Sequence, residues 1–387
     1  MDAAASEADL SDADWRSGEA GRDAGRPVLP AYGGACIDGV VHALLIGPTP
    51  AWVPESARGA RQTVLLVLDG LGWEQLMARA RLAPTLTRMT GGPITTVVPS
   101  TTATALTSLT TGLPPAKHGI VGYRLRVEGN EVLNVLRWRT SAGDARLTLP
   151  PEDFQLAEPF GGVHPPVVTR AEFAETGFTT AHLSGVRFHG WRMPSTLVST
   201  VGQLLDDGEP FVYAYYDGVD KVAHEFGLGR QYDAEVGAAD RVSEEIMGLL
   251  PPGAALVVTS DHGQVDVGEN VVALAPEVLD RVTMLSGEGR FRWLHARPGQ
   301  GDALAAAARR CHGDQAWVRT LAEATSEGWF GGDLTPDSIS RLGDVVIAAR
   351  DAVAFLDPGD TGEVHLRSRH GSLTSAEMLV PLLAARA

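Results

Sequence analysis

Cysteine is scarce in this chain of 387 residues, which contains only Cys36 and Cys311. The two lie far apart and form no CxxC-type pair, so the sequence implies neither a disulfide framework nor a thiolate metal site. Long apolar runs are also missing, and none approaches the length of a transmembrane helix. These absences argue against a disulfide-stapled scaffold and against a protein that spans a membrane.

Lysine is nearly absent: Lys117 and Lys221 are the only two, and arginine carries almost all of the basic charge. The formal net charge of −16 argues against binding to a nucleic-acid duplex or to an anionic membrane surface. An anionic substrate would therefore need local positive charge from arginine or a metal ion. Residues 1–26 are acidic and lack the basic start and apolar core of a signal peptide. We expect them to form a disordered tail and the protein to be cytoplasmic.

Continuous apolar runs of strand length occur at 63–68, 211–216 and 254–259. Such runs are typical of strands buried on both faces of a parallel sheet. Because helical patterns alternate with them, the sequence predicts an α/β fold with a doubly wound, mostly parallel central sheet and helices on both faces. Helices are expected at 73–81, 195–205 and 232–250, and further strands at 178–183 (FTTAHL), 345–349 and 364–366.

We expect residues 27–387 to form one catalytic domain with two lobe-like insertions, at about 123–175 and 280–345. In both segments, short strand-like pieces are separated by loops, and we find no internal repeat. Several aromatic residues, most of them in these lobes, either stack on a nucleobase or form the cores of the lobes. They are Trp138, Trp191, Trp293, Trp329 and Phe330.

The stretch 95–119 (TTVVPSTTATALTSLTTGLPPAKHG) predicts a strand, a sharp turn and a short helix with hydroxyl residues crowded at its start. A helix N-terminus can hold an anion or make a hydroxyl more acidic. Two interpretations of Thr102 are therefore open at this point. Thr102 is a nucleophile, or the hydroxyl residues simply cap the helix.

Acidic and histidine residues follow the predicted buried strands, in turns rich in glycine. Open α/β sheets place ligand groups at the carboxyl ends of such strands. Each residue taken singly could be a cap or a helix-face pair, but chance rarely builds the whole pattern. Carboxylate and imidazole ligands without thiolate suit zinc, manganese or a similar divalent ion. Six ligands would hold two metals: Asp69, Asp220, His224, Asp261, His262 and His370.

These motifs resemble the alkaline phosphatase superfamily and, within it, the nucleotide pyrophosphatase/phosphodiesterase branch. The matching segments are VLLVLDGLG at 64–72, VPSTTATALTSLTTGLPPAKHGIVG at 98–122, DKVAHEFG at 220–227, TSDHG at 259–263 and RHGSLTSAEMLVPL at 369–382. The resemblance covers roughly residues 60–385, and it implies an alkaline-phosphatase-like fold.

Carried over residue by residue, the resemblance implies that Thr102 is the nucleophile. One metal would be bound by Asp220, His224 and His370, and the other by Asp69, Asp261 and His262. The resemblance implies two divalent metal ions, with zinc as the expected metal. The implied reaction cleaves a phosphodiester or pyrophosphate bond of a small phosphorylated, nucleotide-like substrate. A covalent phospho-threonine intermediate would form and would then be hydrolysed.

Two positions near the nucleophile depart from the pattern of this branch. The branch often has a lysine just before the nucleophile and a phosphate-binding asparagine three residues after it, where this chain has Thr101 and Ala105. In place of the asparagine, either another donor, such as an arginine from a lobe, or the backbone N–H of Thr102 alone would hold the phosphate oxygen. Four arginines could also fold over the site and hold the additional charged oxygen of a monoester: Arg187, Arg192, Arg230 and Arg292. The alternatives are a phosphomonoesterase, a phosphonate hydrolase or a phosphoryl transferase of the same fold, or a catalytically silent binding protein.

Overall fold

The computed structural model describes residues 25–360, 362 and 365–387. The predicted tail lies almost entirely outside these residues, and the predicted strand at 364–366 begins outside them. None of the helices in the described part combines the length and the hydropathy needed to cross a membrane.

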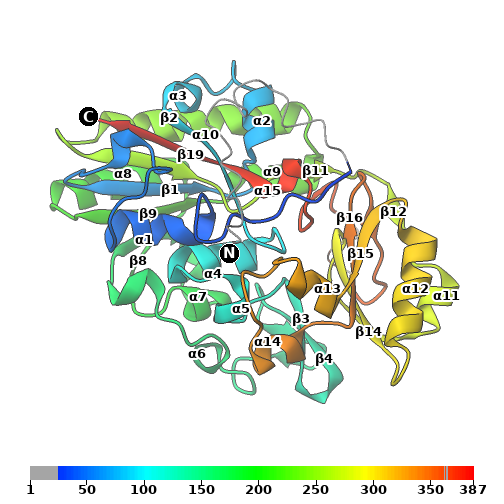
Figure 1. Cartoon of the computed structure of the whole chain (residues 1–387). Helices are drawn as coiled ribbons and strands as arrows, with labels where there is room; N and C mark the ends of the chain where they lie inside the picture. Colours follow the sequence, from blue (N-terminus) through cyan, green and yellow to red (C-terminus); the bar gives the residue numbers. More distant parts are fainter. Residues whose placement is uncertain (1–24, 361, 363–364) are drawn as a thin grey trace, which may run out of the picture.

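The centre of the molecule is a seven-stranded sheet with the order β2-β19-β10-β1-β9-β7-β8 (Figure 1). The strands from β10 to β8 run parallel, whereas β19 pairs antiparallel with both β10 and β2. The mostly parallel sheet predicted from the sequence is therefore confirmed. Its strands are β1 Thr63–Leu68, β2 Thr90–Thr95, β7 Pro166–Arg170, β8 Arg187–Trp191, β9 Phe211–Tyr216, β10 Ala255–Thr259 and β19 Leu379–Arg386.

Helices cover both faces of this sheet, because its central strands are apolar on both sides. In β1, Leu65 and Val67 belong to the core on one face, and Val64 and Leu66 belong to the core on the other. The first core is covered by α1 Val40–Leu45, α4 Thr102–Thr111 and α7 Gly177–His182. The second is covered by α2 Trp73–Ala78, α3 Pro84–Arg88, α8 Pro194–Asp206 and α10 Arg230–Gly248.

The segment 178–183 is not a strand, as the sequence suggested, but lies in helix α7. The side chain of Thr176 accepts a hydrogen bond from the N–H of Thr179, so this residue caps the helix. A short run rich in threonine and apolar residues has no clear periodicity, and the cap decides its structure. The sheet strands of this region are β7 and β8. Strand β7 lies within the segment 123–175 expected to be an insertion, but it pairs with β8 and β9 in the central sheet.

Two smaller antiparallel sheets lie beside the central one (Figure 1). The first has the order β3-β4-β5-β6, and the second has the order β13-β14-β16-β15 and packs on α12. Their elements are β3 Arg124–Val127, β4 Glu131–Asn134, β5 Arg139–Thr140, β6 Gly143–Asp144, β13 Val282–Glu288, β14 Phe291–Ala296, β15 Ala316–Thr320, β16 Val345–Ala349 and α12 Gly301–His312.

Short elements connect these layers, and the pairs β11–β18 and β12–β17 form two-stranded sheets. The strands are β11 Val265–Asp266, β12 Val271–Val272, β17 Ala354–Phe355 and β18 Ser368–Arg369. The helices are α5 Pro115–His118, α6 Pro151–Phe154, α9 Gly218–Phe226, α11 Pro276–Leu279, α13 Leu321–Ser326, α14 Pro336–Arg341 and α15 Ser375–Met378.

The aromatic residues considered for base stacking are fully buried: Trp138, Trp191, Trp293, Trp329 and Phe330. Trp293 and Phe330 stack on each other with their ring centroids 6.2 Å apart. Trp191 stacks on Tyr216 in the same way, at 5.8 Å. These rings therefore serve as core residues and are not available to a ligand.

Candidate active site

The predicted ligand residues meet at the carboxyl edge of the central sheet. Asp69 directly follows β1, and Asp261 and His262 follow β10. Asp220 and His224 lie on α9, which begins two residues after β9. Because β10, β1 and β9 are parallel neighbours, their carboxyl ends lie side by side. The ligand side chains of three segments that are far apart in the sequence therefore lie close together at this edge of the sheet.

Asp69, Asp261 and His262 form the more deeply buried part of this place. The Nε2 atom of His262 lies 3.5 Å from Oδ1 of Asp69 and 3.4 Å from Oδ2 of Asp261. Both of these carboxylate oxygens are buried without a hydrogen-bond partner. The pKa of Asp69 is raised well above its usual range, first by burial and then by the charges of Asp261 and Asp220. Burying several carboxylates so close together is unfavourable unless a cation compensates their negative charge, so this cluster is suited to binding a cation.

The histidines are oriented by hydrogen bonds from their Nδ1 atoms to backbone carbonyl oxygens. His224 donates to Ser368 at 2.7 Å, His262 to Gly263 at 3.1 Å, and His370 to Ser100 at 3.0 Å. Each Nε2 atom is therefore left as the acceptor, the arrangement found in metal-binding histidines. Burial and the neighbouring histidines hold the pKa of His370 well below its usual range, which keeps that ring neutral.

Five of the six ligand candidates fall into two adjoining groups that share His262, and both groups fit divalent metal ions. Asp69, Asp261 and His262 form one group, and Asp220, His262 and His370 form the other; within each, ligand atoms lie within 4.8 Å of one another. The first group has the membership expected from the sequence. In the second, His262 takes the place expected for His224, and the rings of His262 and His370 stack 3.6 Å apart. His224 lies beside this group, with its Nε2 3.3 Å from Oδ1 of Asp220.

Thr102 is the first residue of α4, and its Oγ1 lies 3.1 Å from Nε2 of His262. The N-cap residue is Thr101, whose side chain makes no capping hydrogen bond. The hydroxyl of Thr102 therefore points into the ligand cluster and does not cap the helix. Backbone N–H groups of a first helical turn and the positive end of the helix dipole favour an anion at this point.

Two residues that the sequence analysis missed hold the carboxylates in place. The hydroxyl of Tyr215 donates a short hydrogen bond to Oδ2 of Asp69, and the side-chain amide of Gln264 donates to Oδ1 of Asp220 at 2.5 Å. Gln264 directly follows the TSDHG segment, and Tyr215 lies in the strand that precedes Asp220. Their positions next to the motifs in the sequence could have suggested a role in the site. Only the fold shows that both side chains donate hydrogen bonds to the carboxylates.

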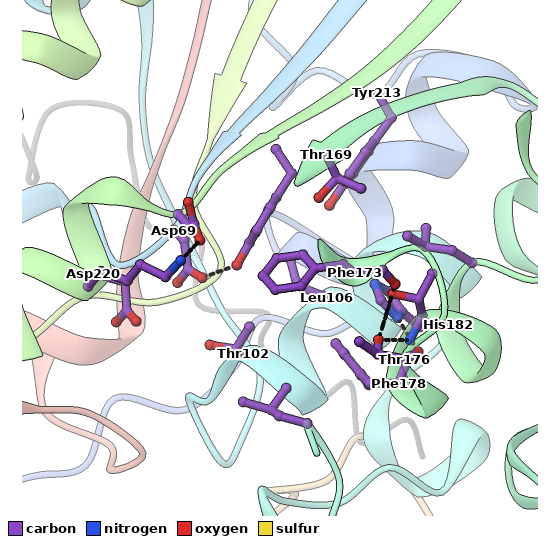
Figure 2. Close-up of a pocket in the computed structure, with 16 residues that line it drawn as sticks. Asp69, Thr102, Leu106, Thr169, Phe173, Thr176, Phe178, His182, Tyr213 and Asp220 are labelled. Carbon is purple, nitrogen blue, oxygen red and sulfur yellow. Dashed lines mark hydrogen bonds and ion pairs between the residues drawn. The ribbon is translucent and has the colours of Figure 1, made fainter. Parts of the chain in front are cut away.

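A cavity of about 220 Å³ opens beside Thr102, Asp69 and Asp220 (Figure 2). Lys221 also lines it and forms an ion pair with Asp217 at 2.5 Å. In the described part of the chain, the arginines considered as phosphate ligands do not line this cavity: Arg187, Arg192, Arg230 and Arg292. Two of them are engaged elsewhere. Arg187 pairs with Glu209, and Arg292 donates to the carbonyl oxygens of Gly287 and Phe355.

Solved structures with the same fold include two ectonucleotide pyrophosphatase/phosphodiesterases and a phosphonoacetate hydrolase. Murine ectonucleotide pyrophosphatase/phosphodiesterase 5 has a TM-score of 0.64 and 18% identity, with 84% of this chain and 87% of that chain covered. The human protein of the same name has a TM-score of 0.61 and 15% identity, with the same coverage. Phosphonoacetate hydrolase from Sinorhizobium meliloti 1021, in complex with phosphonoformate, has a TM-score of 0.61 and 20% identity, with 84% and 90% covered.

A comparison with curated protein sequences gives no significant match. The sequence profile described as "Type I phosphodiesterase / nucleotide pyrophosphatase", by contrast, matches residues 63–373. This match includes every strand of the central sheet except β19, and it includes all seven candidate site residues. The chain therefore belongs to the type I phosphodiesterase/nucleotide pyrophosphatase family of the alkaline phosphatase superfamily.

Proposed function

We propose that this protein is a metal-dependent hydrolase of phosphodiester or pyrophosphate bonds, with Thr102 as its nucleophile. The observation that carries the proposal is the position of the Thr102 hydroxyl, 3.1 Å from Nε2 of His262 at the edge of the carboxylate and histidine cluster. A catalytically silent relative would be expected to have lost the hydroxyl or a ligand. This chain retains all seven residues.

The ligand cluster would hold two divalent ions, and its carboxylate and imidazole donors favour zinc. When bound, such ions stabilise charge on the phosphoryl oxygens and make a nearby hydroxyl more acidic. Tyr215 and Gln264 donate hydrogen bonds to the carboxylates of Asp69 and Asp220 and would keep these two side chains in place for metal binding.

The remaining contributions come from α4. Its N-terminus favours an anionic phosphoryl oxygen next to Thr102. The oxygen of Thr102 would form a bond to phosphorus while one P–O ester bond breaks, and the departing alcohol would take up a proton. Water would then break the bond between Thr102 and phosphorus and release the second product. Helix α4 would thus position both the attacking oxygen of Thr102 and a phosphoryl oxygen.

Nucleotide diesters and pyrophosphates are the proposed substrates. A solved structure of an inactive variant of murine ectonucleotide pyrophosphatase/phosphodiesterase 5, with AMP bound, has a TM-score of 0.63 to this chain. That complex supports a nucleotide ligand for this chain at the level of fold. The phosphonoacetate hydrolase structure supports a phosphonate as the second candidate.

The test is hydrolysis by the purified full chain before and after treatment with EDTA. We expect cleavage of bis(4-nitrophenyl) phosphate, its loss after EDTA, and its recovery on addition of zinc. Metal analysis should find about two ions per chain, because two ligand groups are present. Phosphonoacetate, assayed in parallel by phosphate release, distinguishes the second candidate. Activity on neither substrate in the zinc-loaded protein would refute the proposal.

A further inference from the structure

Ser100 joins the turn that carries the nucleophile to the turn that carries His370. Its N–H donates to the carbonyl oxygen of Gly371 at 3.1 Å, and its hydroxyl donates to the carbonyl oxygen of Ser372 at 2.6 Å. The same hydroxyl accepts a hydrogen bond from the N–H of Gly371 at 3.2 Å, and the carbonyl oxygen of Ser100 accepts from Nδ1 of His370. Every polar atom of Ser100 is therefore bonded to residues 370–372, which lie 270 to 272 positions away in the sequence.

This contact is buried and lies next to the nucleophile. Ser100 and Ser372 are both fully buried, and Ser100 pairs with Gly371 as an antiparallel bridge. Helix α4 begins at Thr102, so a single residue separates Ser100 from the candidate nucleophile. A shift of Ser100 relative to residues 370–372 would therefore also shift Thr102 relative to His370.

The bonds of Ser100 complete a ring of contacts around the candidate active site. Oγ1 of Thr102 lies 3.1 Å from Nε2 of His262, and the ring of His262 stacks on that of His370 at 3.6 Å. Side chains can turn about their χ angles, so these contacts alone do not fix one main chain against the other. The bonds of Ser100 involve main-chain atoms of both turns and supply that constraint.

The hydroxyl of Ser100 satisfies two main-chain groups of the His370 turn at once. It accepts from the N–H of Gly371 and donates to the carbonyl oxygen of Ser372, as a hydroxyl can. Alanine would leave the buried N–H of Gly371 without this acceptor, which is costly, so we expect the turn to move until another group or water reaches it. The main-chain bonds of Ser100 would remain, so we expect the fold to persist.

We propose that Ser100 is a positioning residue, whose hydroxyl fixes the His370 turn against the nucleophile turn and so sets where Nε2 of His370 lies relative to the hydroxyl of Thr102. The hydroxyl is bonded to Gly371 and Ser372, so it acts through His370. Its effect on metal binding depends on the ligand group of Asp220, His262 and His370. Its effect on the rate of hydrolysis rests on the proposed function.

The experiment is a double-mutant cycle on zinc affinity, measured on the full chain by competition with a chromophoric chelator. Ser100→Ala should weaken the binding of one zinc ion about tenfold, the lower end of the effect of an outer-shell partner, because the main-chain acceptor of His370 remains. In the His370→Ala background the ligand that Ser100 positions is gone. Ser100→Ala should then change zinc affinity less than about twofold. A residue that merely stabilised the fold would have the same effect in both backgrounds.

Thr110→Val is the matched control. The hydroxyl of Thr110 is also fully buried and donates to a distant main-chain carbonyl oxygen, that of His182, at 3.0 Å. Thr110 lies near the C-terminal end of α4, whereas Thr102 is the first residue of that helix. This variant therefore also removes a buried hydrogen bond between two segments, but it should leave zinc affinity unchanged within about twofold.

The rate of hydrolysis provides a second readout, with zinc at saturating concentration. Because Ser100→Ala changes the position of the nucleophile relative to the metal ligands, we expect kcat on bis(4-nitrophenyl) phosphate to fall about tenfold or more. We expect KM to change less than about threefold, since the walls of the cavity are untouched. Ser100→Cys keeps a weaker donor and acceptor at this position, so its losses of zinc affinity and of kcat should be smaller than those of Ser100→Ala.

The outcomes separate the two proposals. If the wild type binds zinc but cleaves no diester, the proposed function fails, and the zinc cycle still decides the role of Ser100. If Ser100→Ala leaves zinc affinity unchanged, or lowers it equally with and without His370, the positioning role is wrong. A loss that depends on His370 and is absent in Thr110→Val supports it. If Ser100→Ala does not fold, the same cycle with Ser100→Cys decides by the same criterion.

Discussion

Single hydrogen bonds decide which atoms of the site remain free to react. Each of the three histidines uses Nδ1 for a backbone carbonyl oxygen, and the second oxygen of Asp69 is occupied by Tyr215. The remaining Nε2 atoms of His262 and His370 and the first oxygen of Asp69 lie in the two adjoining ligand groups, next to the hydroxyl of Thr102. The residue types could be predicted from the motifs, because their chemistry is specific. The hydrogen bonds of His224, His370 and Asp69 could not, because each joins residues more than 140 positions apart in the sequence.

Replacing Thr102 should lower the rate of hydrolysis without changing the amount of metal that the protein binds. Thr102→Ala removes the attacking oxygen, and we expect a loss of at least about 1,000-fold in kcat on bis(4-nitrophenyl) phosphate with unchanged metal content. Thr102→Ser keeps a hydroxyl and should retain a measurable fraction of the activity. The measurement is steady-state kinetics together with metal analysis of the same samples.

Thr104→Ala is the control for the Thr102 variants. It removes a buried threonine hydroxyl without a partner from the same helical turn, and it should remain active. Full activity in Thr102→Ala would show that another oxygen attacks the phosphorus, with Ser100 and Thr101 as the nearest candidates in the sequence.

His118 should make the stability of the protein depend on pH. Its Nδ1 accepts a hydrogen bond from the N–H of Ile120, so Nε2 carries the proton and donates to Ser108 at 2.8 Å. Burial, with a smaller effect from Arg341, lowers its pKa to about 3 in the folded state. The unfolded chain, with a pKa of about 6.5, binds the proton more readily, so stability falls as pH drops below that value.

At pH 5 this difference amounts to about 2 kcal/mol for His118 alone. We therefore expect His118→Gln to lose less stability than the wild type between pH 7 and pH 5, as measured by urea denaturation with zinc present. His164→Gln changes an exposed histidine and should follow the wild type. Parallel pH curves for the wild type and His118→Gln would contradict this assignment.

At the scale of elements, the second small sheet supports the turn that carries His370. Arg290, between β13 and β14, forms two hydrogen bonds with Glu377 on α15, at 2.7 and 2.8 Å, and both side chains are fully buried. Glu377 also accepts from the N–H of Ser372 at 2.9 Å. This ion pair ties the lobe to the segment that holds His370. It was not predicted, because the two residues are 87 positions apart in the sequence.

Breaking this ion pair should destabilise the protein far more than breaking a surface pair. Arg290→Met leaves the charge of Glu377 buried and unpaired, so we expect the free energy of unfolding to fall by about 3–5 kcal/mol. Because Glu377 also holds Ser372, we expect weaker zinc binding by the same variant.

Arg187→Met is the matched control, since Arg187 contacts Glu209 through two similar bonds but is 51% exposed. Its loss should cost about 1 kcal/mol or less. Urea denaturation compares the two variants with the wild type, and equal losses would contradict the importance of burial.

For the whole molecule, the central sheet could be predicted because its strands are continuous apolar runs that end in the ligand motifs. The predictions for β1, β9 and β10 therefore hold almost to the residue. Strands β7 and β8 were not predicted, since Thr169, Arg187 and His189 interrupt their apolar pattern. The cavity also escaped prediction. Its lining comes from α4, α7, β9 and the first insertion, which only the folded chain brings together.

The positions of the arginine and lysine side chains predict that the enzyme prefers diester substrates to monoester substrates. A monoester dianion carries an additional charged oxygen, which a fixed cation normally holds. The four arginines considered for that role do not line the cavity in the described part of the chain, and Lys221, which does, is paired with Asp217. We therefore expect kcat/KM for bis(4-nitrophenyl) phosphate to exceed that for 4-nitrophenyl phosphate by at least about tenfold under the same zinc conditions.

Lys221→Met tests whether the argument from charge is correct. The diester lacks the additional charged oxygen, so this variant should change its kcat/KM less than about threefold. A monoester rate equal to or above the diester rate in the wild type would overturn the preference. If Lys221→Met then abolished only the monoester activity, Lys221 would be the group that holds the third oxygen. To do so, it would have to leave its ion pair with Asp217. Asp217 would keep its other partner, Arg170, whose Nε lies 2.7 Å from Oδ1, so the ion pair with Lys221 can open without leaving a buried carboxylate unpaired.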